Sequence, residues 1–282
     1  MVTSSEILEI VEIIYFAPAV FVALFVCVRH GFSREAGWLS LAILSVVRAV
    51  GAALGIAATK NPSTGLITAA LVLSSIGSAV LVAALTGIAN RIETGSGLSH
   101  LSPKIRKYIQ LIGLVAIIMG IVGGTKVADS DPDTRSDGYT FIKVSAVFIL
   151  VQYLANVYLL SLSAMNMRRI IEADRRLFFA AAASCPFIFI RVVYSLCAAF
   201  DPTSSVFSTR SNSVTAVAVR AVMAIAMEII AASFLLFGGL VAPKMQTGEV
   251  KNADAQHELL HQKGYSSDET RYQAPVGPAP RY

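Results

Sequence analysis

Charged side chains occur inside the apolar segments of this chain, in stretches where a lipid bilayer would surround them. Arg48 lies within SVVRAVGAAL, and Arg191 lies within PFIFIRVVYSL. A charge at the bilayer centre costs about 2.5–3.5 kcal/mol on insertion scales, so such residues face a helix-bundle interior and pair or bind there. We single out six ionisable residues of this kind, three acidic and three basic: Glu9, Glu12, Arg48, Arg191, Arg220 and Glu228.

The depth of these residues along their helices predicts which of them meet. With a helix rise of about 1.5 Å per residue, Arg48 and Glu228 fall near the midplane, as does the amide of Gln152. Arg191 and Glu12 lie further toward one surface. We therefore predict that Arg48 pairs with Glu228 and that Arg191 pairs with Glu12.

Two roles fit such a cluster. It can form a pocket for a polar or anionic group, entered from outside or from the outer leaflet, because intramembrane charges mark functional sites. It can equally be a closed salt-bridge lattice that fixes helix register. For the first role, the candidate ligand-binding residues are Glu12, Arg48, Gln152, Arg191, Arg220 and Glu228.

The elements that must position these residues are transmembrane helices. Of the 282 residues, 55% are hydrophobic and 15% are charged, whereas about 25% of residues in soluble domains are charged. The apolar residues form segments of roughly 20 residues, long enough to cross a bilayer as helices. The sequence thus predicts an all-α, multi-pass bundle of seven spans: 7–28, 38–58, 66–89, 108–127, 141–164, 177–199 and 214–241.

Basic residues in the short loops predict the orientation of the bundle. They are concentrated in the first, third and fifth loops and are sparse in the others. Cytoplasmic loops carry an excess of Lys and Arg, which places the N-terminus outside and the C-terminus in the cytosol. The net charge of +5 is therefore a topology signal, and we expect membrane lipids, not nucleic acid, as partners. The sequence does not distinguish the plasma membrane from an endomembrane.

The chain divides into a seven-helix transmembrane domain, residues 1–242, and a polar tail, residues 243–282, which we expect to be disordered and cytosolic. Within the tail, YSSDE places Ser266 and Ser267 before acidic residues, as candidate phosphorylation sites. We expect no catalytic residue, no metal ligand and no cofactor. The tail sequence HELLH has the letters of the zinc-protease motif H-E-x-x-H, but it lies in the polar tail that we expect to be disordered, so we expect its histidines to bind no metal. The loop DSDPDTRSDG has Thr134 where a calcium loop has its sixth-position glycine, and Thr140 where it has its final glutamate.

Small residues predict where helices approach one another closely. Gly51 and Gly55 share a helix face with Arg48, so a close contact there would carry the arginine into the bundle. A second smooth face, in the third span, is a candidate surface for a partner helix and consists of Ser75, Ala79, Ala83 and Gly87.

The motifs SVVRAVGAAL, PFIFIRVVYSL and AMEII, with the short polar tail, resemble an uncharacterised fungal family of seven-helix integral membrane proteins. The resemblance covers roughly residues 7–241. More distantly, the chain is similar to lipid-translocating exporter-like and receptor-like fungal seven-helix proteins. The resemblance implies a fungal source and a cellular membrane, and it transfers no activity.

Three functions remain open at this point. The first is a sensor or transporter for a small or lipid-like ligand, since short loops leave no room for an extracellular recognition domain. The second is a membrane-embedded enzyme resembling the fungal seven-helix terpene cyclases, in which Glu12 or Glu228 would donate a proton from a site away from guanidinium groups. The third is a structural protein, which would have a closed bundle without a cavity.

Overall fold

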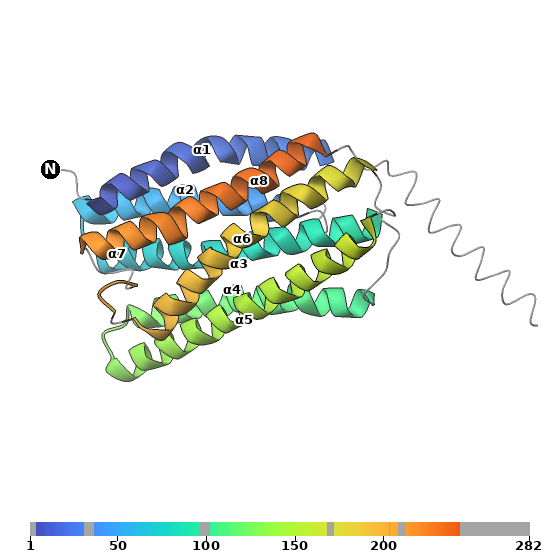
Figure 1. The fold of residues 1–282 in the computed structure, drawn as a ribbon. Helices are drawn as coiled ribbons and strands as arrows, with labels where there is room; N and C mark the ends of the chain where they lie inside the picture. The colour runs from blue at the N-terminus through green and yellow to red at the C-terminus, as the bar shows by residue number, and fades with distance from the viewer. Residues whose placement is uncertain are drawn as a thin grey trace, which may run out of the picture. The chain divides into compact units, whose positions relative to one another are not determined.

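A computed structural model describes residues 4–30, 37–95, 102–167, 172–202, 204–207 and 213–242. Within these ranges the chain is helical, with short turns and no strand. The last helical segment is continuous and consists of two α-helices joined by a π-helix. In chain order the elements are α1 (Ser4–His30), α2 (Trp38–Lys60), α3 (Thr64–Gly95), α4 (Pro103–Val127), α5 (Pro132–Met165), α6 (Glu172–Phe200), α7 (Val214–Val219), η3 (Arg220–Ala226) and α8 (Met227–Val241) (Figure 1).

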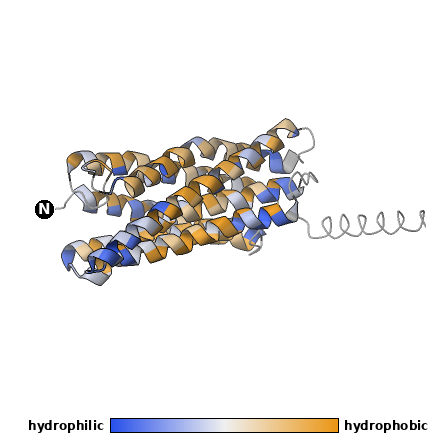
Figure 2. Cartoon of the chain, turned by 90° about the horizontal axis from the view of Figure 1, so that it is seen from below, coloured by the Kyte–Doolittle hydropathy of each residue, from blue (hydrophilic) through white to orange (hydrophobic). Residues whose placement is uncertain are grey.

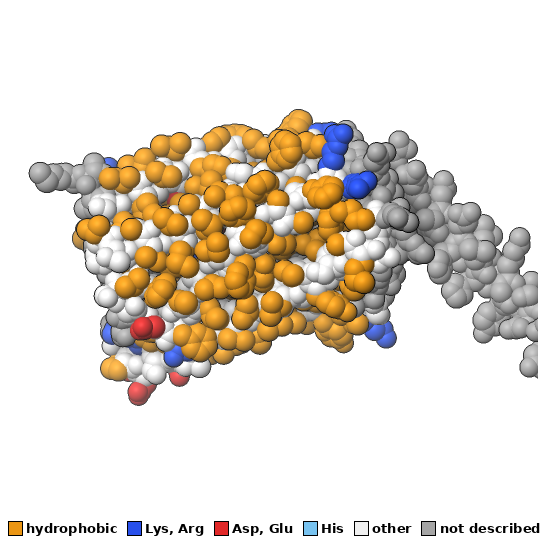
Figure 3. Space-filling view, in the orientation of Figure 1, with side chains coloured by type: hydrophobic (Ala, Val, Ile, Leu, Met, Phe, Trp, Pro, Cys, Tyr) orange, Lys and Arg blue, Asp and Glu red, His pale blue; other side chains and the backbone are white. Residues whose placement is uncertain are grey.

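The described residues contain seven helices that are long and apolar enough to cross a membrane. This confirms the all-α class and the seven predicted spans. Apolar residues run along the helices, and hydrophilic residues gather at their ends (Figure 2). Apolar side chains cover most of the face shown in Figure 3. Large apolar side chains are exposed along the helices, such as Phe21, which is 74% exposed, and Ile14, which is 68% exposed. Such an apolar surface suits contact with lipid. The helices themselves can lie in lipid because their backbone polar groups are hydrogen-bonded within each helix.

The helices extend beyond the predicted spans because polar turns continue past the apolar pattern. Helix α5 begins at Pro132, nine residues before the predicted start at 141. Asp131 caps it by accepting a hydrogen bond from the Thr134 amide at 3.1 Å, and proline is favoured in the first turn. The Thr134 hydroxyl also donates to Asp131 at 2.7 Å, and these bonds lower the pKa of the Asp131 carboxyl.

Helix α3 is at the centre of the packing, in contact with α2, α4, α5, α6 and α8. Where α2 begins, Gly37 has a φ of 70°, and a Cβ there would lie 2.8 Å from the Ile88 nitrogen of α3. Only glycine combines this left-handed conformation with so close an approach. Of the predicted smooth face on α3, Ala79 and Gly87 are buried within the chain and Ser75 is exposed, and a partner helix on this face stays a prediction.

The predicted tail, with Ser266 and Ser267, lies outside the described residues. The orientation of the termini likewise stays a prediction.

Candidate ligand-binding cavity

Glu228 of α8 is fully buried at the centre of the charged cluster, with an exposed fraction of 0%. The Nε and Nη2 atoms of Arg48, from α2, donate to its two carboxylate oxygens. Arg191 of α6 donates from Nε to Glu228 Oε2 at 3.0 Å. The structure therefore confirms the predicted pairing of Arg48 with Glu228 and adds a second arginine to the same carboxylate.

The predicted pairing of Arg191 with Glu12 is wrong. Arg191 pairs with Glu228, whereas Oε2 of Glu12 lies 3.7 Å from Nη1 of Arg48. Depth along the membrane cannot tell which helices are neighbours in its plane, and α6 packs directly against α8. We call these four residues, Glu12, Arg48, Arg191 and Glu228, the ion network; its two carboxylates and two guanidiniums carry no net charge.

A glycine on α3 makes room for the Arg48 side chain. A Cβ at Gly77 would lie 2.6 Å from Arg48 Nε and 2.9 Å from its Cζ. The two glycines predicted to bring Arg48 inside act differently: a Cβ at Gly51 would lie 3.2 Å from Leu73 Cβ on α3, and Gly55 faces the carboxylate of Glu9 on α1. Gly77 was not predicted, since nothing in its sequence context separates it from other glycines of apolar spans.

The π-helix η3 begins at Arg220 and was not predicted from the sequence. Short π segments inside α-helices frequently occur at functional sites. This one interrupts the helical segment that carries Glu228 and places Arg220, Ala224 and Ile225 on the wall of a cavity.

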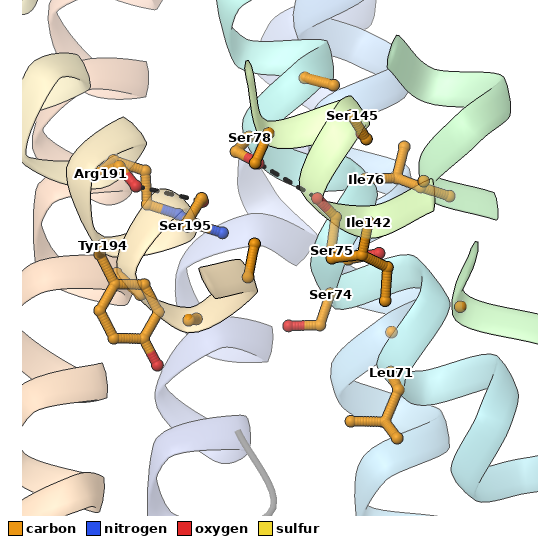
Figure 4. Close-up of a pocket in the computed structure, with 18 of the residues that line it drawn as sticks. Leu71, Ser74, Ser75, Ile76, Ser78, Ile142, Ser145, Arg191, Tyr194 and Ser195 are labelled. Atoms are coloured by element: carbon orange, nitrogen blue, oxygen red, sulfur yellow. Dashed lines mark hydrogen bonds between the residues drawn. The ribbon is translucent and has the colours of Figure 1, made fainter. Parts of the chain in front are cut away.

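The cavity has a volume of about 250 Å³. In Figure 4, Arg191, Tyr194 and Ser195 of α6 lie on one side, and Ser74, Ser75 and Leu71 of α3 lie across from them. One part of its wall is polar and includes Glu9, Glu12, Arg48, Arg191, Tyr194 and Arg220. The remainder is largely apolar and includes Leu71, Ile76, Ala79, Ile117, Ile142 and Ile149.

Two of the predicted binding residues do not line this cavity. Glu228 is enclosed by its arginine partners. Gln152 donates from Nε2 to the Thr86 hydroxyl at 3.0 Å, and Asn156 donates to the same oxygen at 2.8 Å. Gln152 thus belongs to a separate buried polar group on α3 and α5, with its amide packed against Gly113 of α4. Asn156, one turn after Gln152, was identifiable as a second buried amide on the same helix face.

A second charged group lies at the opposite end of the bundle from the cavity. Arg91, which the sequence assigned to a loop, is a buried residue of α3. Its Nη2 atom is 3.4 Å from Asp174 Oδ1, its Nη1 atom is 3.2 Å from His30 Nδ1, and its guanidinium lies 5.6 Å from the Trp38 ring. These contacts join α1, α2, α3 and α6.

The sequence matches a protein family over residues 2–245, described as a domain of unknown function (DUF7702). The chain belongs to this family. No curated protein and no solved structure matches the chain. This membership agrees with the expectation of an uncharacterised family, whereas the fungal source and the similarity to exporter-like and receptor-like proteins stay expectations. The function is therefore argued from the site.

The contacts in this DUF7702 protein bear on the alternatives left open by the sequence. A proton-donating glutamate was expected to lie away from guanidinium groups, yet Glu228 contacts two of them and Glu12 lies 3.7 Å from one. A purely structural bundle was expected to be closed, yet a cavity of about 250 Å³ adjoins the ion network.

Proposed function

We propose that this protein binds a small or lipid-like ligand in the cavity, as a sensor or a transporter. The observation that carries the proposal is the wall itself, in which charged side chains of membrane-spanning helices face an apolar surface. Ligand sites combine apolar walls with a few polar groups that fix orientation. On the predicted orientation, the cavity lies in the outer half of the membrane.

In this proposal the two halves of the charged cluster have different roles. Glu228 is fully buried and shared by Arg48 and Arg191, so it holds α2, α6 and α8 in register. Glu9, Glu12 and Arg220 line the cavity, where a ligand would meet them. The structural and binding alternatives therefore apply to different residues of one cluster.

The size of the cavity limits the ligand. Sites for drug-sized molecules range from about 300 to 1,000 Å³, and this cavity, at about 250 Å³, is slightly smaller. It accommodates a small molecule, or the head group and first part of the chain of a single-chain lipid.

Filling the cavity tests the proposal. Ser74 is exposed on α3 and lies at the cavity in Figure 4, so Ser74→Trp places an indole in the space. Ile67→Trp is the matched control, because Ile67 lies on the same helix, is 42% exposed and is not part of the cavity wall. Native mass spectrometry of protein purified in mild detergent then measures the bound small molecules.

We expect the wild type and Ile67→Trp to carry a bound species at roughly one per chain, and Ser74→Trp to lack it. The same bound species on Ser74→Trp, or none on the wild type, would contradict the proposal.

A further inference from the structure

The arginines beside the cavity already have acceptors. Arg48 donates from Nε and Nη2 to Glu228, and its Nη1 lies 3.7 Å from Glu12. Arg191 donates from Nε to Glu228 at 3.0 Å and from Nη1 to the Ser195 hydroxyl at 2.5 Å. Since charge-assisted hydrogen bonds are the strong ones, an anionic ligand would have to share these guanidiniums with a carboxylate that is already in place and that would repel it.

The carboxylates on the cavity wall lack hydrogen-bond donors among the described residues, although Glu12 has an ion pair with Arg48. Glu12 is only 9% exposed, and within the described part of the chain no group lies within hydrogen-bonding distance of its carboxylate. Glu9 lies one turn earlier on the same face of α1. Its Oε2 atom is shielded from solvent and has no hydrogen-bond donor among the described residues. A buried acceptor without a donor costs about 1–3 kcal/mol, so a donor on the ligand would be favoured here.

The serine hydroxyls of the wall also present acceptors. A hydroxyl has one proton and two lone pairs, and these hydroxyls donate their proton to a backbone carbonyl. Ser75 donates to Val72 at 2.8 Å and Ser145 donates to Ala116 at 2.7 Å. Ser78 donates to Ser75 at 3.1 Å (Figure 4). The lone pairs of their oxygens remain for a ligand, so this part of the wall accepts hydrogen bonds.

Arg220 is the remaining cation on the wall, and it acts electrostatically on both Glu9 and Glu12. The six charges of the cluster, three carboxylates and three guanidiniums, sum to zero. The net charge therefore does not select between an anion and a cation. The selection comes from hydrogen bonding. Arg48 and Arg191 each already donate to Glu228, whereas among the described residues Glu12 has only the 3.7 Å ion pair with Arg48 and Glu9 Oε2 has no donor.

We infer that the cavity takes a single-chain amphiphile whose head group donates hydrogen bonds, a hydroxyl or a primary ammonium, and that it rejects phosphate and carboxylate head groups. The donor meets Glu12 and Glu9, and the chain lies against the apolar wall. This inference rests on the proposed function and narrows the ligand of the same cavity.

A series of octyl compounds with different head groups tests the inference. The full chain in phosphatidylcholine nanodiscs is titrated with octan-1-ol, octylammonium or octyl phosphate, and its thermal unfolding is followed. The shift in melting temperature of Ser74→Trp, in which the cavity is filled, measures the effect of each compound that only partitions into the lipid. Glu12→Gln removes the charge of a wall acceptor, and Asp133→Asn is its control, because Asp133 is exposed in the first turn of α5, outside the cavity.

We expect octan-1-ol and octylammonium to raise the melting temperature of the wild type in a saturable way. Octyl phosphate should shift the melting temperature of the wild type no more than it shifts that of Ser74→Trp. Glu12→Gln should weaken octylammonium binding at least tenfold, and Asp133→Asn should leave it unchanged. Preferential binding of octyl phosphate, lost in Arg220→Gln, would overturn the inference and leave the proposed function standing. Equal shifts of wild type and Ser74→Trp with every compound would overturn the proposed function itself.

Discussion

Removing charges from the ion network in different pairs should give opposite results, although each pair contains one acid and one base. In Arg191→Met/Glu228→Met, the ion pair between Glu12 and Arg48 remains. In Arg48→Met/Glu228→Met, Glu12 loses its guanidinium partner and Arg191 loses its carboxylate partner. The geometry therefore predicts that the first double variant is tolerated and the second is not.

The magnitude follows from the number of charges left without a partner. Each single substitution of Arg48, Arg191 or Glu228 leaves the network with one unit of uncompensated charge, and breaking a buried ion pair in this way costs about 3–5 kcal/mol. Replacing both members by apolar residues is often close to neutral. We expect Arg191→Met/Glu228→Met to recover to within about 1 kcal/mol of the wild type. The other double variant should remain at least as unstable as the single variants.

Equilibrium unfolding in mixed micelles of a non-ionic detergent and dodecyl sulfate measures these free energies. The chain has one tryptophan, Trp38, which is fully buried and so reports unfolding by fluorescence. Arg135→Met is the control, because Arg135 is exposed at the start of α5, and it should change the free energy of unfolding by less than about 0.5 kcal/mol. Full recovery of Arg48→Met/Glu228→Met, without recovery of Arg191→Met/Glu228→Met, would refute the shared network in favour of an isolated pair.

Two further predictions concern the packing of Arg48 and the start of α5. Gly77→Ala puts a Cβ 2.6 Å from Arg48 Nε and should lower the free energy of unfolding by about 1–3 kcal/mol. Gly65→Ala is the control, because a Cβ there meets nothing within 4 Å, and it should not lower the free energy of unfolding. Equal effects of the two substitutions would contradict this account. The hydrogen bonds from Thr134 lower the pKa of Asp131 in the folded protein. The stabilisation of the folded state by this cap should therefore be complete above the unfolded aspartate pKa of about 3.9. It should be lost as the pH falls through the lower pKa of the folded state. Proton NMR should then show protection of the Thr134 amide falling only in that acid range, and protection unchanged in Asp131→Ala would contradict the cap.

The sequence was sufficient for the architecture because the bilayer constrains it so strongly. A spanning segment must satisfy its backbone internally and be apolar for roughly 20 residues, so the seven helices follow from hydropathy alone. The same reasoning identified Arg48 and Glu228 as partners, since both fall near the midplane. The polar turns at helix ends, such as the first turns of α5, lack that signal and were missed.

The arrangement within the membrane plane was decided only by the tertiary structure. Depth is a property of position along one helix, whereas the choice of Arg191 or Arg48 as a partner depends on which helices are neighbours. The space for Arg48 beside Gly77 and the π-helix at Arg220 depend on that packing as well. The sequence by itself therefore determined that charges are buried, and tertiary packing decided which guanidiniums are occupied and which carboxylates, Glu9 and Glu12, face a cavity.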